Sequence, residues 1–367
     1  MAGPDPLLLP DPNFDCTPAD CEYLSGIRPY RQSSFRLETQ NLSVQGAGTK
    51  FVVHNYGHGG AGITLSWGCA SQVRDLVHAR ARATGETKVA VLGSGVMGLT
   101  AATLIRELGL TVTVYAREFW EATTSRVAGA QWAPSSVIYA DKVKFADVLK
   151  TSYNRFKSDL TNGFGISEVP NYTPEPDPYL DLVEKLVPGL MPKPVPMNLP
   201  FDHLTDPGFK YQTFLIETPI FLKRLNDDLH AHSVPFKPCT FADVASVLAL
   251  QENIIVNCTG LGGLTLWNDR DVHPIKGHLA LLNAQSKLDY LFSRNNYLFP
   301  RTDAVIIGGT YRYDDATTNP DLALAQQLVD YMKGVFGVGP KIPMPKFHID
   351  HPDNREYIAT REVQASS

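Results

Sequence analysis

Residues 88–118 read KVAVLGSGVMGLTAATLIRELGLTVTVYARE, and this stretch decides the fold class. Its first five residues are a continuous apolar run typical of a buried parallel strand. The glycine turn GSGVMG follows, and residues 99–109 predict a helix that ends at Gly109. Residues 110–116 predict a second strand. The stretch therefore predicts a βαβ unit.

Gly93, Gly95 and Gly98 form the pattern GxGxxG directly between the first strand and the helix. In that position the backbone N–H groups and the helix dipole face a pyrophosphate. Glu118 stands just past the second strand, where an acidic side chain hydrogen-bonds an adenosine ribose hydroxyl. A glycine turn with a purely structural role is the alternative, but the strand, the helix and Glu118 together favour dinucleotide binding.

Other segments extend this sheet and predict a second domain. Residues 253–260 (NIIVNCTG) and 50–55 (KFVVHN) predict two more strands of the parallel sheet. Three later segments, 209–217, 297–301 and 304–313, contain alternating apolar and polar residues, which favours antiparallel strands. The proline-rich residues 169–200 predict loop around one short helix. The fold class is therefore α/β with an α+β partner domain.

A second glycine-rich turn, HNYGHGGAG, covers residues 54–62. His54 and His58 are close enough in sequence to suggest a metal site, but a glycine-dense loop lacks the rigid spacing and further ligands of such a site. Gly59, Gly60 and Gly62 instead allow the main chain to approach a flat ligand. Ile63 and Thr64 then begin a helix whose dipole stabilises negative charge on it. The helix buries one face, with apolar positions at Ile63, Trp67, Ala70, Val77 and Ala81.

Composition excludes several classes of partner. The 367 residues carry a net charge of −5 with scattered Lys and Arg, which excludes nucleic acid and an anionic membrane surface and favours a small molecule. No apolar run reaches transmembrane length. Five cysteines at loose spacings fit a reducing compartment better than a disulfide framework. We therefore expect a cytoplasmic protein, and the last three residues do not match an SKL-type peroxisomal signal.

Arg28 and Arg31 flank a proline in GIRPYR. Either guanidinium could pair with a carboxylate in a bidentate manner, and a solvated surface arginine is the alternative. The residues alone leave both open.

A family resemblance bears on that choice. SGIRPYR (25–31), RLE (36–38) and HNYGHGGAGITLSWGCA (54–70) resemble the C-terminal signature of the D-amino-acid and D-aspartate oxidases. The GxGxxG unit, TTSRVAGAQWAP (123–134), GFKYQTFLIETPIFLKRL (208–225), VNCTGLGG (256–263), PIKGHL (274–279) and YLFPRTDAVIIGGTYR (297–312) resemble the rest of that family in its usual order. The closing segment of the family thus precedes its opening segment, which implies a circularly permuted D-amino-acid oxidase architecture. Chain termini that lie close together at the surface make this physically reasonable.

The resemblance implies a site and a cofactor, FAD. Arg28 is similar to the arginine that pairs with the substrate carboxylate, Tyr297 to the tyrosine that hydrogen-bonds it, and Gly60 to the residue whose carbonyl receives the amino group. The residues implied to hold FAD are Gly93, Gly95, Gly98, Glu118, Thr124, Ser125, Ala130, Gln131, Thr259, Gly59, Gly62, Ile63 and Thr64.

The same resemblance implies a discontinuous domain division. The FAD-binding, Rossmann-like domain would comprise residues 46–134 and 208–268, and the substrate domain residues 22–45, 135–207 and 269–340. Residues 1–21 and 341–367 have no clear match. Ser293 stands where animal members of the family have a lid tyrosine, and Gln131 and Phe299 replace aliphatic pocket residues, so the substrate preference does not transfer.

The implied reaction is hydride transfer from the α-carbon of a D-amino acid to flavin N5. Its products are a 2-oxo acid, ammonia and, after reoxidation by dioxygen, hydrogen peroxide. Two alternatives stay open: oxidation of a secondary amine or natural-product intermediate, for which Arg28 would be dispensable, and a flavoprotein without catalytic activity. The family resemblance also allows a homodimer and a peroxisomal location.

Overall fold

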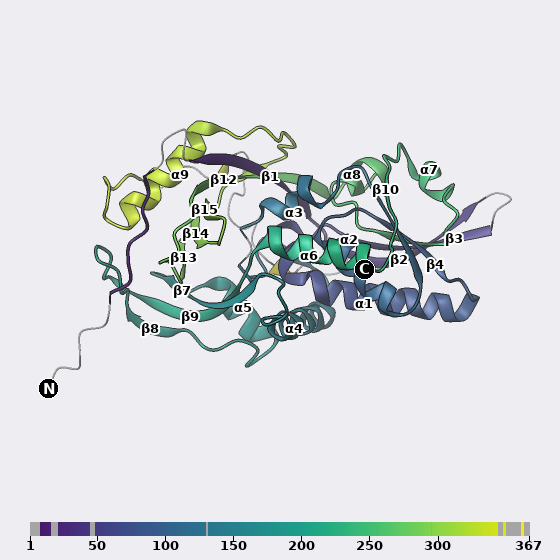
Figure 1. The fold of residues 1–367 in the computed structure, drawn as a ribbon, viewed down its shortest axis with the longest axis horizontal. Helices are drawn as coiled ribbons and strands as arrows, with labels where there is room; N and C mark the ends of the chain where they lie inside the picture. The colour runs from purple at the N-terminus through teal and green to yellow at the C-terminus, as the bar shows by residue number, and fades with distance from the viewer. Residues whose placement is uncertain are drawn as a thin grey trace.

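The computed structural model describes residues 8–15, 21–44, 48–129, 131–294, 296–343, 348–349 and 361–362. Two sheets dominate this part of the chain. In Figure 1 the parallel sheet with its helices lies on the right, and the mixed sheet lies on the left. The long strands β1 (Glu22–Arg31) and β12 (Val272–Asn283) pair antiparallel along the top of that view.

The parallel sheet contains the strands that the apolar runs predict. β4 (Lys88–Leu92) pairs parallel with β5 (Thr111–Ala116) on one side and with β11 (Ile254–Asn257) on the other, and β11 pairs parallel with β3 (Gly48–Tyr56). Val89, Val91, Ile254 and Val256 are fully buried, as expected for strands that are covered on both faces. The order across the sheet is β10 (Phe236–Pro238), β5 (Thr111–Ala116), β4 (Lys88–Leu92), β11 (Ile254–Asn257), β3 (Gly48–Tyr56) and β2 (Arg36–Val44).

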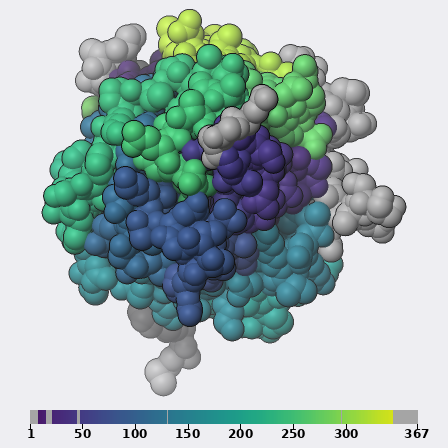
Figure 2. All heavy atoms as spheres, turned by 90° about the vertical axis from the view of Figure 1, so that its right-hand side faces the viewer, coloured from purple at the N-terminus to yellow at the C-terminus, as the bar shows by residue number. Residues whose placement is uncertain are grey.

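Helices cover both faces of the parallel sheet. On one face α1 (Gly62–Thr84) packs against α2 (Val96–Glu107) and α4 (Lys142–Ser158), and α6 (Thr218–Ala231) packs against α2. Figure 2 shows the resulting surface, where purple and blue N-terminal segments lie beside green segments from much later in the chain. On the other face lie α7 (Val244–Leu248) and α8 (Gly262–Leu266), near the buried Val52, Leu92 and Ile255.

The mixed sheet contains the segments with alternating pattern, and most of its pairs are antiparallel, as predicted. Two pairs are parallel instead, β7 with β13 and β16 with β17. Besides β1 and β12 its strands are β7 (Ile166–Thr173), β8 (Val195–Asn198), β9 (Pro207–Ile216), β13 (Leu291–Arg294), β14 (Asn296–Pro300), β15 (Ala304–Gly308), β16 (Tyr311–Tyr313) and β17 (His348–Ile349).

The two faces of the mixed sheet have different neighbours. One face packs on α9 (Leu322–Val335) through residues such as Leu282 and Ile307. The opposite face carries Leu279, Leu291 and Phe299, which cluster with Val127 of the short helix α3 (Thr124–Val127). That second face therefore borders the glycine turns. The remaining elements are η1 (Gly59–Ala61), η2 (Trp120–Ala122), α5 (Pro178–Leu186), β6 (Ile138–Tyr139) and β18 (Arg361–Glu362).

The prediction of loop around one helix for residues 169–200 is wrong in part. The helix is present as α5, but β7 runs through Thr173 and β8 follows α5. The prediction treated the prolines as loop residues, whereas Pro170 lies inside β7. Strand β13 pairs with β7 only at Asn171 and Tyr172, so at Pro170 strand β7 has a neighbouring strand on one side only. Such an edge position tolerates a proline, which has no N–H to donate.

The domain division stays a prediction, and two strands pair with the sheet of the other predicted domain. β2 pairs with β3 in the parallel sheet, whereas β9 pairs with β7 in the mixed sheet. Sheet membership therefore favours assigning residues 36–44 to the cofactor side and residues 207–216 to the substrate side.

Segments near the two ends of the chain lie together on the mixed sheet. Residues 8–15 run beside the end of α9, and the rings of Phe14 and Phe336 are 5.8 Å apart. The Tyr290 hydroxyl donates to the Pro10 carbonyl at 2.7 Å. Cys21 follows this segment and is disulfide-bonded, so the argument for a reducing compartment from free cysteines does not hold for this residue.

Candidate active site

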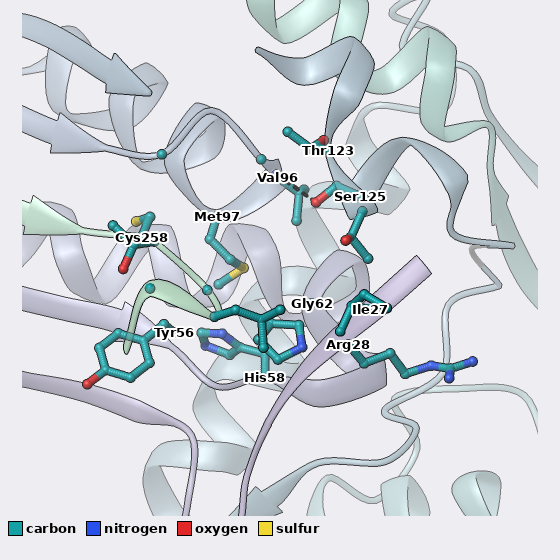
Figure 3. A pocket seen from close by; sticks show the side chains of 18 of the residues that line it. Ile27, Arg28, Tyr56, His58, Gly62, Val96, Met97, Thr123, Ser125 and Cys258 are labelled. Carbon is teal, nitrogen blue, oxygen red and sulfur yellow. Dashed lines mark hydrogen bonds between the residues drawn. The ribbon is translucent and has the colours of Figure 1, made fainter. Parts of the chain in front are cut away.

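A cavity of about 590 Å³ lies between the two sheets. It runs from the carboxyl ends of β3, β4, β5 and β11 to residues of β1, β12 and β14. In an open α/β sheet, ligands bind outside the carboxyl ends of the strands. Figure 3 shows residues from both glycine turns and from β1 around this space.

The first glycine turn is closed by backbone contacts. Gly93 has a φ of +105°, and a Cβ there would lie 2.5 Å from the Cys258 carbonyl oxygen. A Cβ on Gly98 would lie 2.0 Å from the Gly93 carbonyl oxygen, so α2 and β4 meet at their main chains. Gly98 itself does not line the cavity, whereas Gly93 and Gly95 do. Its role is the close packing of helix on strand.

The start of α2 is suited to an anion. Its first turn contains no acidic residue, and its N-cap Gly95 supplies no side-chain cap. The Ser125 hydroxyl accepts a hydrogen bond from Val96 N at 3.1 Å, and the two residues face each other in Figure 3. Thr124 and Ser125 both line the cavity. Free N–H groups, the helix dipole and these hydroxyls make a binding surface for phosphates.

The far end of the cavity has the form of a nucleoside site. Glu118 lines it with a carboxylate that is 50% exposed, and the Ser94 hydroxyl donates to the Glu118 carbonyl at 2.7 Å. Cys239, Thr240 and Phe241 line the same end. Sequence reasoning missed these three, because the segment after β10 carries no motif.

The second glycine turn follows β3 at the same edge of the sheet. Gly59 has a φ of +55°, and a Cβ there would lie 1.9 Å from the Ser136 carbonyl oxygen. Gly59, Gly60, Gly62 and Ile63 line the cavity, and the first turn of α1 has no acidic residue. This edge is where the sequence placed the turn.

The Thr64 side chain bonds within the protein, and the role of this helix start at the flavin stays a prediction. Its hydroxyl donates to the Ala133 carbonyl at 2.8 Å and accepts from Ala133 N at 3.1 Å. It is buried and does not line the cavity. Thr64 therefore ties α1 to the segment that follows Gln131. Thr259 lines the cavity, Gln131 does not, and the prediction for Ala130 lies outside the described residues.

Arg28 lies at the other end of the cavity. Its Nη1 donates to the Thr310 carbonyl at 3.1 Å, and its guanidinium carbon lies 4.5 Å from the centre of the Tyr311 ring. A Cβ on Gly277 would lie 2.5 Å from Nη1, so the guanidinium needs a glycine beneath it. In Figure 3 Arg28 extends from its strand away from the Tyr56 side of the cavity.

Among the described residues, Arg28 forms no ion pair, which leaves its charge available to an acid. Tyr297 hydrogen-bonds Arg28, and burial raises the pKa of its hydroxyl to about 12, although the nearby guanidinium acts in the opposite direction. The phenol is therefore a neutral donor at physiological pH. Together the two side chains can hold a carboxylate by charge and by hydrogen bonds. Tyr311 and Gly277, which support Arg28, were missed by sequence reasoning because they are on other strands.

The two histidines of HNYGHGG are buried structural residues. His54 lies between Gln40 Oε1, 2.9 Å from Nε2, and Asn257 Nδ2, 3.0 Å from Nδ1. Burial lowers the pKa of His54 and of His58 to about 3. Within the described ranges, no group of three His, Cys, Asp or Glu side chains is placed to hold a metal. No described helix has the length and apolar character needed to cross a bilayer.

Comparison with known proteins identifies the class. The family model described as FAD dependent oxidoreductase, DAO, matches residues 88–172. The chain is 26% identical to a D-amino-acid oxidase of Rubrobacter xylanophilus over 262 residues, which cover 66% of this chain and 75% of the relative. It is 22% identical to that of Dictyostelium discoideum over 272 residues, covering 71% and 75%. A D-amino acid oxidase of Dugesia ryukyuensis is 50% identical over 62 residues, covering 16% and 18%.

Two solved structures match parts of this chain. An L-amino acid deaminase from Proteus vulgaris has a TM-score of 0.46 and 13% identity over 61% of this chain and 60% of its own. A glycerol-3-phosphate dehydrogenase from Bacillus halodurans, complexed with FAD, has a TM-score of 0.46 and 10% identity over 74% and 57%.

The chain is an FAD-dependent oxidoreductase: residues 88–172 match the DAO family model, and about two thirds of the chain is similar to D-amino-acid oxidases. The residues present fit FAD. The cradle between Gly93 and Cys258 has no room for side chains, and two helix starts without acidic residues border the same long cavity.

Proposed function

We propose that this protein oxidises D-amino acids to imino acids, which water hydrolyses to 2-oxo acids and ammonia, and reduces dioxygen to hydrogen peroxide. The observation that carries the proposal is Arg28, a half-buried guanidinium that lines the cavity and has no acidic partner among the described residues. An unpaired charge in such a place is costly unless a ligand neutralises it. An α-carboxylate meets that requirement, whereas an amine without a carboxylate leaves the charge unpaired.

The substrate binds at one end of the cavity and the cofactor at the other. Arg28 and Tyr297 hold the substrate carboxylate, and the Gly60 carbonyl receives the amino group. Bound FAD would supply the hydride-acceptor chemistry and the reaction with dioxygen. Gly93, Gly95, Ser125 and Thr124 would hold its phosphates, Glu118 its ribose, and Gly59, Gly62, Ile63 and Thr259 its ring. Such chemistry depends mainly on orientation, so no side chain is assigned as a general base.

We also infer that the order of the chain is permuted relative to its relatives. The GxGxxG strand β4 comes third in the parallel sheet, while β3 precedes it in sequence and lies beyond β11. Only residues 85–87 separate α1 from β4, and Phe14 packs near Phe336. A chain that begins at Lys88 and ends at Thr84, with residues 8 and 340 joined by a short linker, should fold and bind FAD; failure to do so would contradict the inference.

The proposed reaction is tested with the FAD-bound protein and a panel of D-amino acids beside their L-enantiomers. We expect peroxide and the matching 2-oxo acid in equal amounts from D-amino acids and neither product from the L-enantiomers. A protein that retains FAD but releases no peroxide with any D-amino acid would overturn the proposal.

A further inference from the structure

A row of polar side chains crosses the mixed sheet on the face that borders the cavity. Tyr297 of β14 lies directly opposite Ser293 of β13. Leu291, two residues earlier on the same side of β13, lies opposite Asn171 of β7, and Asn171 lies opposite Tyr211 of β9. Side chains opposite each other, or two residues apart, project from one face of a sheet. We call Tyr297, Ser293, Asn171 and Tyr211 the polar row.

Hydrogen bonds orient three members of the polar row. The Ser293 hydroxyl donates to Asn171 Oδ1 at 3.1 Å. Gln131 Nε2 donates to the Tyr211 hydroxyl at 2.8 Å, and that hydroxyl donates to Asp177 Oδ2 at 2.5 Å. These bonds fix the orientation of Ser293 and Gln131, whose side chains are half-buried, whereas Asn171 and Tyr211 behind them are fully buried.

The polar row begins at the carboxylate anchor. Of its four members, Tyr297 contacts Arg28 and lines the cavity, and the other three continue from it across the sheet. The segment that carries Gln131 covers the row, because a Cβ on Gly129 would lie 2.7 Å from the Tyr297 ring and 3.1 Å from that of Phe299. With a carboxylate at Arg28, the side chain of an amino acid can extend from Tyr297 toward Ser293, one strand spacing of about 4.8 Å away.

The charges around the row select among polar side chains. Lys210 and Arg294 are adjacent in sequence to row members and therefore point to the opposite face. Arg28, the cation of this face, is occupied by the α-carboxylate. Asp177, at the far end, disfavours a second negative charge, although burial raises the pKa of its carboxyl. Asn171 Nδ2 is buried with the Tyr211 hydroxyl as its neighbour and makes no hydrogen bond of ordinary geometry among the described residues, so an apolar group beside it would leave this amide poorly satisfied.

We propose that the polar row makes this site selective for D-amino acids with a neutral hydrogen-bonding side chain, with an amide as the best match. An amide offers a donor to Ser293 Oγ or Gln131 Oε1 and an acceptor to the Ser293 hydroxyl or the Asn171 amide. This inference rests on the proposed function, since it assumes a carboxylate at Arg28. It names Ser293 and Asn171 as specificity-determining residues.

D-asparagine and D-leucine provide the test, because they have nearly the same shape and differ in polarity. We expect kcat/KM for D-asparagine to exceed that for D-leucine by roughly 10-fold or more, since a site that hydrogen-bonds a polar group rejects an analogue that lacks it. Asn171→Leu should reverse the preference, and Ser293→Ala, which leaves the buried residues in place, should reduce it. The exposed Asn41→Leu on β2 is the matched control and should leave the ratio unchanged.

A binding measurement separates this inference from the proposed reaction. Succinamate and 4-methylpentanoate are the same two molecules without their amino groups, and each can be titrated against the flavin absorbance of the FAD-bound protein. Tighter binding of succinamate supports the polar row even when turnover is absent. Equal or tighter binding of 4-methylpentanoate, or a D-leucine rate at or above that of D-asparagine, would overturn the inference while leaving D-amino-acid oxidation intact.

Discussion

The two ends of the cavity recognise their ligands by different means. At the cofactor end the main chain does most of the binding, with Gly93, Gly98 and Gly59 packed so closely that a Cβ would lie within about 2.5 Å of a backbone oxygen. At the substrate end the groups are side chains, Arg28 from β1 and Tyr297 from β14, and the polar row continues from Tyr297 across the sheet. Backbone recognition depends on short contiguous motifs, whereas side-chain recognition is assembled from strands far apart in sequence.

The difference predicts where substitutions are tolerated. A change at the cofactor end alters main-chain geometry and should affect the fold and FAD binding together. A change at the substrate end removes one functional group from a rigid sheet and should affect turnover alone. The following variants test that separation.

The largest effect is expected for Gly98→Ala. The new Cβ would lie 2.0 Å from the Gly93 carbonyl oxygen, so α2 must move away from β4. Overpacking of this kind costs typically 1–3 kcal/mol and occasionally more, and the clash here is with a main-chain atom rather than a flexible side chain. We expect loss of bound FAD and a lower unfolding temperature, measured by flavin absorbance and thermal denaturation.

Gly62→Ala is the matched control for that variant. A Cβ there would meet only Val96, at 3.9 Å, and Gly62 has an ordinary helical conformation. The cofactor-free protein should therefore unfold at the wild-type temperature. A Gly98→Ala protein that keeps FAD and wild-type stability would show that the close contact between α2 and β4 is not required.

At the substrate end, Arg28→Ala should reduce kcat/KM for D-amino acids while FAD binding stays at the wild-type level. Loss of one partner of a buried charge pair costs about 2–5 kcal/mol, or roughly 30-fold to several-thousand-fold. Tyr297→Phe removes one charge-assisted hydrogen bond to the same carboxylate and should cost about 1.5–3 kcal/mol. Steady-state kinetics of both variants give the order, and a larger effect of Tyr297→Phe would contradict the assignment of Arg28 as the anchor.

The same contrast explains what the sequence could predict. The βαβ unit, the further parallel strands and both glycine turns were recognisable, because glycine patterns and apolar runs are local. Arg28 remained ambiguous from its own neighbours, and only the family resemblance favoured the site. Tyr311, Gly277 and the polar row could not be predicted from the sequence. Strand register brings these residues together, and no local pattern specifies that register here. The hydrogen bond from the Thr64 hydroxyl to Ala133 was likewise not indicated by any local pattern.

The smallest effect concerns pH and the buried His54 at the cofactor end. Burial lowers the pKa of this imidazole to about 3 from an ordinary value of 6.5, so His54 is neutral in the folded protein. The unfolded chain binds a proton below about pH 6.5 that the folded chain does not, so the stability contributed by neutral His54 is complete above that pH and is lost as pH falls toward the folded value. Between pH 7 and pH 5 this amounts to about 2 kcal/mol of unfolding free energy for one histidine, at about 1.4 kcal/mol per pH unit.

His54→Gln should be less stable than wild type at pH 7 and should lose less stability on acidification, as measured by urea unfolding at the two pH values. His230→Gln, at an exposed position on α6, is the control for loss of a surface histidine. An unchanged pH dependence in His54→Gln would mean that the ring is not held neutral by its surroundings.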